Sequence, residues 1–394
     1  MGVYLTVALT VLTHTSFKGS KVVIALYAYE LGANPLTIGL LFSMYSLFPI
    51  FLSVYAGKLS DRYGSRIPML FGATGLVVGL LLPFAFPRLA TLFVSATLIG
   101  VCYLFYIVSV QHLIGSIGEA ANRTRNYSIF GLGIAFTALI GPTTAGFAID
   151  AFGYQNAYLL LAVIPGIPIL AMLVFPRLLP SIQIKAKPPG KQRTRDLLRN
   201  RPLRRALITA GVIETGVELF NFFLPIYGRS IDFSASQIGI IIGTFGAAQL
   251  VVRTILPALV RRSSEERVLS TSLYLAAATY LVFPFVSSFA GLLVMAFVLG
   301  LGLGTGSPIS LVLAYNRSPA GRSGEALGIR QTVNKVTETT MPIVFGSLGV
   351  LATVAAFWAD AAMLAVGAWL IGKDAIPRRS KPPPEVASHD AESK

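Results

Sequence analysis

The feature that most constrains this chain is a series of long apolar stretches that recurs along its 394 residues. Each stretch has about 20 residues, the length that a helix needs to cross a hydrocarbon core of about 30 Å. Only 12% of the residues are charged, roughly half the share of an ordinary soluble domain. We therefore predict an all-α membrane protein with twelve transmembrane helices, at 4–29, 37–57, 67–86, 90–117, 124–148, 155–176, 206–228, 236–260, 268–286, 289–314, 324–348 and 352–371.

The predicted spans fall into two groups of six, which we expect to form two pseudo-symmetric bundles. Residues 1–176 and 206–372 hold the bundles, residues 177–205 form a basic linker, and we expect residues 373–394 to be a disordered tail. The halves also resemble each other at an offset of 200 residues. Ile38-Gly39 recurs as Ile238-Gly239, and Gly141-Pro142 followed by Gly146 is echoed by Met341-Pro342 followed by Gly346. These landmarks indicate an internal duplication.

The net charge of +15 is explained by topology. Of the 32 Lys and Arg residues, only Arg88 and Arg229 fall on the side opposite to both termini, and five lie within predicted spans. The positive-inside rule then places both termini in the cytoplasm, in a bacterial inner membrane. Because the basic residues are spread over short loops, we expect no nucleic-acid partner. The N-terminus has no basic leader or cleavage site, so we expect the first helix to be retained.

A ten-residue motif connects the second and third predicted spans. It reads Gly57-Lys58-Leu59-Ser60-Asp61-Arg62-Tyr63-Gly64-Ser65-Arg66 and resembles the signature G-x-L-[AS]-D-R-[FY]-G-x-[RK] of the major facilitator superfamily. Twelve spans, a 6+6 division and a basic central loop extend the resemblance to essentially the whole chain. The resemblance implies a secondary transporter of the major facilitator fold that works by alternating access. It also implies a cytoplasmic latch formed by Gly57, Asp61, Arg62, Gly64 and Arg66, with Arg330 as a partner of Asp61 or a ligand of the substrate.

The fifth predicted span carries a second motif of this kind, around Gly141 and Pro142. It is similar to the family's exporter-associated motif G-x-x-x-G-P-x-x-[GA]-G, which implies a role in gating, but Ala138 stands four residues before the proline. Close helix packing explains these small residues equally well. In the fourth span, Gln111 occupies the position that aligns with the arginine of proton-coupled drug exporters, which counts against drug export.

We expect eight ionisable residues at bilayer depth. An ionisable group at this depth costs roughly 2.5–3.5 kcal/mol on insertion scales, so each is a functional candidate. Five are positive and three negative, and the surplus of two positive charges predicts an anion in the cavity. The eight are Lys18, Lys21, Glu214, Glu218, Arg253, Arg330, Lys335 and Glu338.

The spacing of these residues predicts that several share one cavity. His14, Lys18 and Lys21 stand at i, i+4 and i+7 and form one stripe of the first helix. Glu214, Glu218 and Asn221 repeat this spacing on the seventh helix, which by the resemblance faces the first across the transport pathway. On the eighth helix, Gln249 and Arg253 offer a planar fork for a carboxylate. The combination of a lysine on the first helix and an arginine on the eighth is similar to that of the monocarboxylate transporter branch of the family.

These observations favour a proton-coupled transporter of a small organic anion, a carboxylate. We expect Lys18 and Arg253 to bind the anion, and Lys21, Gln249, His14, Asn221 and Tyr103 to complete the site. Glu218, Glu214 and Glu338 are the expected proton carriers. Burial favours the protonated form of a carboxyl group and a neighbouring lysine favours the ionised form, so a change in either can move a proton. The partners are then a small anionic substrate, protons and the lipid bilayer, and we expect a monomer.

Two other functions remain open at this point. The first is a proton-driven exporter of drugs or cationic metabolites, in which Glu214 and Glu218 bind the cation. The second is a non-transporting receptor or scaffold with a transporter fold. At single residues, Lys21 could instead extend to the outer interface, and Lys335 could simply pair with Glu338. The sequence has no nucleotide-binding P-loop and no metal-spaced Cys or His cluster, so we expect no enzyme, cofactor or metal.

Overall fold

The computed structural model describes residues 2–117, 123–175, 197, 199–319, 323–348 and 353–373, and the regular structure in these ranges is entirely helical. Most of the predicted linker, residues 177–196 and 198, and the tail after 373 lie outside them, whereas a helix already begins at Arg201, within the predicted linker. The first half of the chain contains α1 (Gly2–Glu30), α2 (Pro35–Tyr63), α3 (Arg66–Ala85), α4 (Leu89–Ser116) and α5 (Arg123–Val174). The second contains α7 (Arg201–Ser230), α8 (Ala235–Arg262), α9 (Glu265–Val282), the short 3₁₀ helix η2 (Phe283–Phe285), α10 (Phe289–Gly304), α11 (Gly306–Asn316), α12 (Ser323–Leu348) and α13 (Thr353–Gly372).

These helices account for the twelve predicted spans. α5 holds two of them and bends between them at Gly153, where φ is 77° and ψ is 170°, a conformation that favours glycine. α10 and α11 together form the tenth predicted span, interrupted at Thr305. Among the described residues, nine stretches are long and apolar enough to cross a membrane. α1 and α12 are not among these nine, because polar and charged side chains lower their hydropathy.

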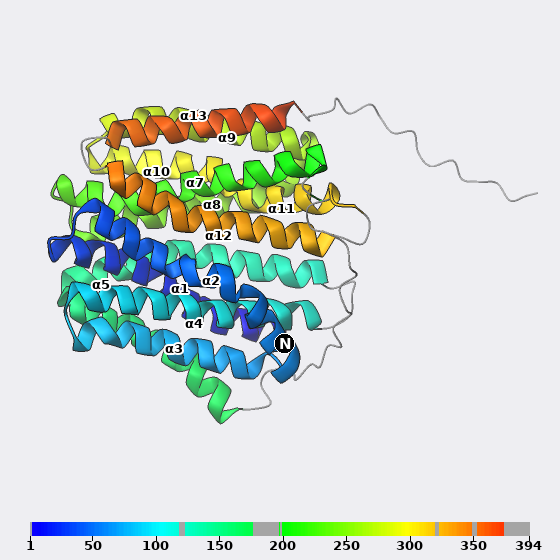
Figure 1. The fold of residues 1–394 in the computed structure, drawn as a ribbon. Coiled ribbons are helices and arrows are strands. Elements are labelled where there is room, and N and C mark those ends of the chain that lie inside the picture. The colour runs from blue at the N-terminus through cyan, green and yellow to red at the C-terminus, as the bar shows by residue number, and fades with distance from the viewer. Residues whose placement is uncertain are drawn as a thin grey trace, which may run out of the picture.

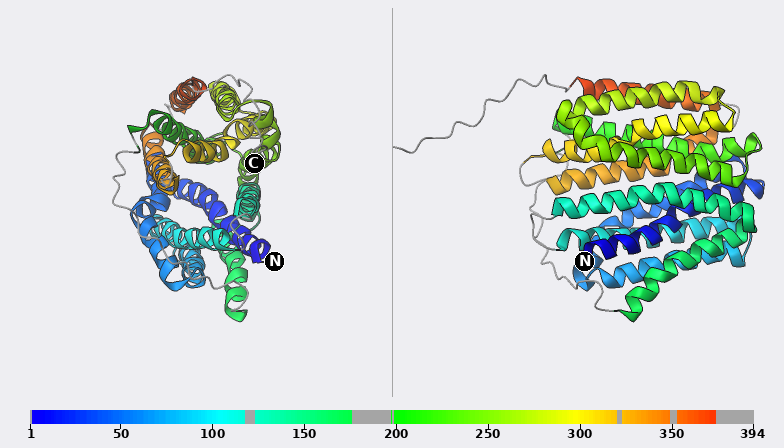
Figure 2. Two further views of the ribbon diagram at one scale, coloured as in Figure 1. Left: turned by 90° about the vertical axis from the view of Figure 1, so that its right-hand side faces the viewer. Right: turned by 180° about the vertical axis from the view of Figure 1, so that it is seen from behind.

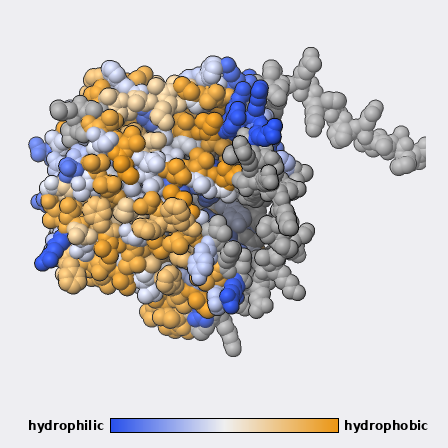
Figure 3. Space-filling model, in the orientation of Figure 1, coloured by the Kyte–Doolittle hydropathy of each residue, from blue (hydrophilic) through white to orange (hydrophobic). Residues whose placement is uncertain are grey.

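The outer surface suits a bilayer. Large apolar side chains such as Phe51, Leu170 and Trp369 are more than half exposed. Figure 3 shows that hydrophobic residues cover most of the visible side of the molecule, while hydrophilic ones gather toward its two ends. A soluble protein rarely exposes so much apolar surface to water. The surface is instead suited to contact with lipid.

The two halves of the chain form two groups of helices that lie side by side (Figure 1) and are seen end-on in Figure 2. The N-terminus, the α2–α3 turn and the start of α7 lie at one end of the bundle. We call it the basic end, because the arginines of the helix ends gather there, among them Arg62, Arg66, Arg201, Arg262 and Arg267. The opposite end carries the α1–α2, α3–α4 and α7–α8 connections.

At this opposite end the halves touch through two equivalent sets of contacts. A Cβ added to Gly39 of α2 would lie closer than 3.0 Å to the Pro342 carbonyl oxygen of α12, and one on Gly239 of α8 would lie as close to the Pro142 carbonyl oxygen of α5. Gly346 approaches Pro35 in the same way, and Gly146 approaches Ala235. Each contact has its counterpart at an offset of 200 residues. The landmarks of the sequence repeat are therefore the points at which the halves meet.

Polar contacts reinforce this end, which we call the closed end. Asp150, at the end of the first span within α5, accepts hydrogen bonds from the backbone N–H groups of Ala235 and Ser236, at 3.1 and 2.7 Å. These groups begin α8, where a helix carries partial positive charge. Arg229 lies 3.2 Å from Glu30 and donates to the Tyr154 hydroxyl at 3.3 Å. All of these contacts join one half to the other.

Toward the basic end the halves separate. Among the described residues, the hydrogen bonds and ion pairs between the halves lie at the closed end or at mid-height, and none lies near the basic end. At the basic end, Arg66 donates to the Met172 carbonyl of its own half at 2.6 Å. Figure 3 shows the surface hollowed on this side, beside the grey segments. The structure is thus closed at one end and open at the other.

Candidate substrate and proton site

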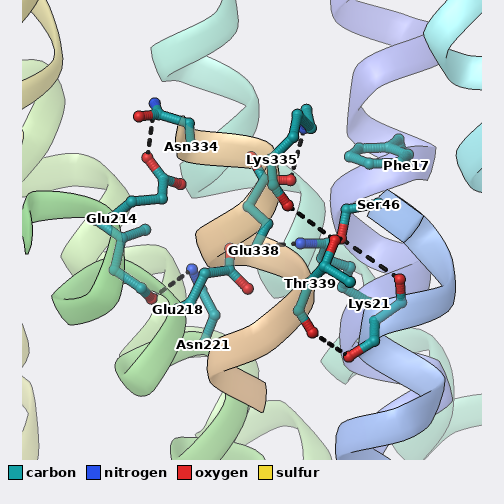
Figure 4. Close-up of polar contacts among 12 residues, drawn as sticks. Phe17, Lys21, Ser46, Glu214, Glu218, Asn221, Asn334, Lys335, Glu338 and Thr339 are labelled. Carbon is teal, nitrogen blue, oxygen red and sulfur yellow. Dashed lines mark hydrogen bonds and ion pairs between the residues drawn. The ribbon is translucent and has the colours of Figure 1, made fainter. Parts of the chain in front are cut away.

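The deepest polar side chains of both halves meet at mid-height, above the closed end. They come from α1 and α2 of the first half and from α7 and α12 of the second (Figure 4). His14 and Ser20 are buried residues of α1. α7 separates its polar from its apolar side chains most clearly, and Glu218 is among its buried residues. The i, i+4, i+7 spacing on α1 and α7 thus places charged stripes inside the bundle, as expected for buried helices with one polar face.

Two ion pairs organise this central cluster. Lys21 Nζ lies 3.5 Å from Glu218 Oε1 and joins α1 to α7 across the two halves. Lys335 Nζ lies 2.5 Å from Glu338 Oε2 on α12, the pairing that the i, i+3 spacing allows. Both carboxylates are largely buried, with side-chain exposures of 5% and 18%. The interpretation of Lys21 as an interfacial lysine is wrong, because its amine is held inside by Glu218.

Further hydrogen bonds complete the contacts around these pairs. Glu214 accepts a bond from the Asn334 side-chain amide at 3.1 Å. Thr339 donates to Ser46 at 3.0 Å, and Ser43 donates to the Thr339 carbonyl at 2.6 Å. These contacts tie α12 to α7 and to α2 at the level of the charges. A shift of one half against the other must therefore break the bonds between α12 and α2, whereas the Glu214–Asn334 bond lies within the second half.

An aromatic wall lies beside the lysines. Phe17 stacks on Tyr103 with ring centroids 3.9 Å apart and meets Tyr45 edge-on at 5.8 Å. His14 Nδ1 and the Tyr103 hydroxyl share a hydrogen bond. Lys21 Nζ lies 5.9 Å from the centroid of the Tyr45 ring, within the range of a cation–π interaction. The site combines aromatic surface with fixed charges.

Lys18 is the exception among these charges. Its amine has no acid within ion-pair distance among the described residues, although Glu214, Glu218 and Glu338 all act on it electrostatically. Its Cβ packs against Gly141 of α5, where an added Cβ would lie 2.8 Å away. Gly141 thus lets α5 approach α1 at the level of the cluster, while the adjacent Pro142 contacts α8. Lys18 is held by its stem and leaves its amine unpaired.

Three residues predicted to bind the anion with Lys18 take no part in the ion pairs of the central cluster among the described residues. No charged group in the described part of the chain acts on Arg253, and its buried Nε has no partner. Gln249 packs against Gly304 of α10. Asn221 donates to the Val217 carbonyl of its own helix at 2.9 Å. The expected Lys18–Arg253 anion site is therefore not formed in this structure, because the i, i+4 spacing fixes a face of α8 but not the helix that this face meets.

Arg330 is also engaged away from the ion pairs. Its guanidinium donates to the Ser310 hydroxyl at 3.1 Å and to Ser307 at 3.2 Å, both on α11, and only Glu214 acts on it from the cluster. The ion pairs and their neighbours thus contain three lysines and three glutamates. The predicted surplus of two positive charges is not gathered around one cavity, because it came from Arg253 and Arg330.

The latch residues lie at the open basic end. Gly64 closes the α2–α3 turn with φ 73°, and the Arg62 guanidinium lies 5.3 Å from the Tyr63 ring centroid. Neither Arg62 nor Arg66 contacts an acid among the described side chains, and the side chain of Asp61 lies outside them. The acid pairs expected of Arg62 and Arg66 are thus not formed among the described side chains, and the pair expected of Asp61 lies outside them.

Several polar residues of the site were not predicted. Ser43, Ser46 and Thr339 carry no signal in the sequence, because short hydroxyl side chains are common in spans and usually bond to their own helix. Asp360 is different, since it is a further ionisable residue in the interior of a predicted span and is missing from the eight above. It is fully buried in α13, outside the central cluster. The charge itself was the signal that would have found it.

Comparisons with known proteins agree with this architecture. A family profile described as Major Facilitator Superfamily matches residues 6–234 and 206–392. Multidrug resistance protein MdtG of Dickeya zeae (strain Ech586) is 25% identical over 340 residues, covering 82% of each chain. The protein of the same name from Citrobacter koseri is 26% identical over 354 residues, covering 84% of each chain.

Solved structures show the same fold at low sequence identity. A POT family transporter in complex with a thioalcohol-conjugated peptide superposes with a TM-score of 0.81 at 16% identity, covering 94% of this chain and 95% of that one. The nucleoside transporter NupG superposes with a TM-score of 0.76 at 15% identity, covering 94% of this chain and 99% of the other. At such identities the likeness concerns the fold alone.

Proposed function

This chain belongs to the major facilitator superfamily of transporters, and on that premise we propose that it exports amphipathic organic compounds, drugs among them, in exchange for protons. It is a multi-pass membrane protein and not an enzyme. We place its basic end in the cytoplasm of a bacterial inner membrane, following the positive-inside rule. The structure then corresponds to an inward-open state, closed toward the outside by the contacts of α2 with α12 and α5 with α8.

The observation that carries this proposal is the composition of the central cluster. Its lysines and glutamates balance, and two of the three pairs are already closed, so there is no strong preference for an anion. The neighbouring rings of Phe17, Tyr45 and Tyr103 offer aromatic surface for a bulky apolar compound. The relatives named multidrug resistance protein support the same reading. It replaces the carboxylate transporter as the favoured function.

Exchange with protons follows from competition for Glu218. The side chain of Glu218 is 5% exposed, one of its carboxylate oxygens has no hydrogen-bond partner among the described residues, and the other pairs with Lys21 across the halves. A proton on Glu218 neutralises the charge that holds Lys21, and a cationic substrate in contact with Glu218 competes with Lys21 for the same charge. Because a carboxylate cannot be protonated and pair with a cation at once, the two ligands exclude each other. Mutual exclusion at one site is sufficient for antiport.

A carboxylate transporter remains a second candidate, favoured by Lys18 alone. Its amine is the one lysine of the cluster without an acid partner among the described residues. An anionic group of a substrate could pair with it. In that case Lys18→Ala should abolish binding of the anion, whereas it should leave binding of a lipophilic cation intact or improve it.

Transport by reconstituted protein tests the proposal. Liposomes containing the protein are loaded with a fluorescent lipophilic cation or a labelled carboxylate, and a pH gradient of either sign is imposed. We expect movement of the cation against the proton flux in the wild type and its loss in Glu218→Gln. Glu265→Gln, the same change outside the cluster, should retain it. Gradient-driven movement of carboxylates but not of cations would contradict export and support the second candidate.

A further inference from the structure

Asp360 is a buried acid that the proposed mechanism does not use. It lies in the middle of α13, is 0% exposed, and neither carboxylate oxygen has a hydrogen-bond partner among the described residues. No lysine or arginine of the described chain acts on it. Removing an ionised carboxylate from water without a partner costs several kcal/mol. Its surroundings must therefore neutralise the charge.

Three helices surround this carboxyl group, and none offers a cation. On α7, a Cβ added to Gly216 would lie 3.3 Å from Asp360 Oδ2, so the carboxyl group lies against the helix backbone. On α9, Tyr280 is close enough for the two groups to interact electrostatically. On α10, Leu303 packs against the same glycine. Tyr280 is the only titratable neighbour among the described residues.

The two hydroxyl groups beside Asp360 donate their hydrogens to backbone carbonyl oxygens in this structure. Tyr280 donates to the Gly216 carbonyl, and Thr215, which is close enough to interact with the carboxyl group through its hydroxyl, donates to the Val212 carbonyl at 2.8 Å. A hydroxyl has one hydrogen to donate, so both present only lone pairs to Asp360 as long as they keep these bonds to the backbone. An ionised carboxylate has only lone pairs as well. A carboxylic acid, in contrast, can donate its hydrogen to either hydroxyl.

We propose that Asp360, Thr215 and Tyr280 form a proton-binding site behind α7, in which Asp360 is a neutral carboxylic acid that donates a hydrogen bond to one of the two hydroxyls. Binding consists of the uptake of one proton by the carboxylate, and no other bond changes. The site lies on the back of the helix that carries Glu214 and Glu218. Residues two positions apart on a helix differ by about 200°, so Gly216 faces away from both glutamates.

This position links the site to movements of α7. Loss of the proton leaves a charge between α7, α9 and α13 that only water or an ion could relieve, so the packing seen here requires the protonated form. In the export cycle the site would then hold a second proton, whose release accompanies a change in the packing of α7. This link to transport rests on the proposed function. Proton binding by Asp360 does not.

Infrared spectroscopy of the purified protein in detergent tests proton binding directly. A protonated carboxylic acid has a carbonyl stretching band that an ionised carboxylate lacks, and we expect one such band of the wild type at neutral pH to be missing in Asp360→Asn. Asp150→Asn removes an exposed, hydrogen-bonded acid at the closed end and should leave the band in place. An unchanged band in Asp360→Asn would overturn the proposal, and so would its loss on addition of Na⁺ but not of choline.

A second variant keeps the test decisive if Asp360→Asn does not fold. Tyr280→Phe retains Asp360 and removes one of its two acceptors, so the band should persist with a shifted frequency. A band at its wild-type frequency in both Tyr280→Phe and Thr215→Val would contradict the site. These readouts use no substrate, so they are independent of export. In transport, Asp360→Asn should reduce pH-driven accumulation while leaving exchange of substrate for substrate intact, and failure of that arm alone would affect only the link to transport.

Discussion

Lys21 and Glu218 show how much of the site is determined at the scale of single residues. The stripes of α1 and α7 can be predicted from spacing, because a helix places i, i+4 and i+7 on one face. The partner of each charge cannot, because it depends on how whole helices are placed. Lys21 meets Glu218, whereas Arg253 meets no acid among the described residues, although the sequence favours Arg253 as a ligand of the substrate. Spacing assigns a face to a residue and does not assign its neighbour.

The buried pair gives a prediction for stability. Lys21→Met leaves Glu218 buried without a counter-charge, which costs about 3–5 kcal/mol where the acid stays ionised. The double variant Lys21→Met/Glu218→Gln removes both charges and should recover most of that loss. Thermal unfolding in detergent at neutral pH measures it, with Arg229→Gln as a control in a partly exposed pair worth about 0–1 kcal/mol. Equal melting of the single and double variants would show that the pair does not contribute.

At the scale of helices, the close contacts at the closed end follow from the sequence repeat. Gly39 and Gly239 occupy the same place in the two halves, and each lies against the carbonyl oxygen of a proline in the opposite half. The repeat and its landmarks are visible in the sequence, but their meaning as contact points is not, because a glycine can equally mark a packing site within one half. Gly141, against Lys18 and Thr15 of its own half, is such a case.

Alanine at these glycines should open the closed end. A methyl group at Gly39 or Gly239 overlaps the facing carbonyl oxygen, and overpacking costs about 1–3 kcal/mol, which corresponds to roughly a 5- to 150-fold shift of a two-state equilibrium. Distances between spin labels on the α1–α2 and α7–α8 connections should lengthen in Gly39→Ala and Gly239→Ala. Gly131→Ala, where nothing lies within 4 Å, is the matched control. Unchanged distances in both variants would show that these contacts do not keep this end closed.

For the whole molecule, the fold is the part most completely predicted from sequence. Twelve spans, two bundles and the break between them follow from apolar length and from the repeat, because the bilayer fixes the length of every helix. The conformational state does not follow, since closed and open ends use the same helices in the same order. The substrate class that we propose differs from the one predicted from the sequence for a related reason, because a total of charges over the sequence ignores which of them share a cavity.

Orientation is a further prediction at this scale. In a Cys102→Ala background, Lys191→Cys in the linker should react with a membrane-impermeant thiol reagent only when the cytoplasmic side is accessible. Arg88→Cys, in the α3–α4 connection at the closed end, should react in intact cells. The reverse labelling pattern would show that the molecule has the opposite orientation in the membrane. It would also make the state seen here outward-open.

Proton release on binding of a lipophilic cation tests the central claim most directly. Tetraphenylphosphonium is added to the purified protein in weakly buffered detergent over a range of pH, and the change in pH is recorded together with binding. Competition for Glu218 predicts acidification where Glu218 is protonated in the free protein, and no acidification in Glu218→Gln even where the cation still binds. Binding of the cation without proton release, or the same release in Glu218→Gln, would contradict exchange at this carboxylate. Alkalinisation on addition of a carboxylate instead would identify anion and proton uptake together.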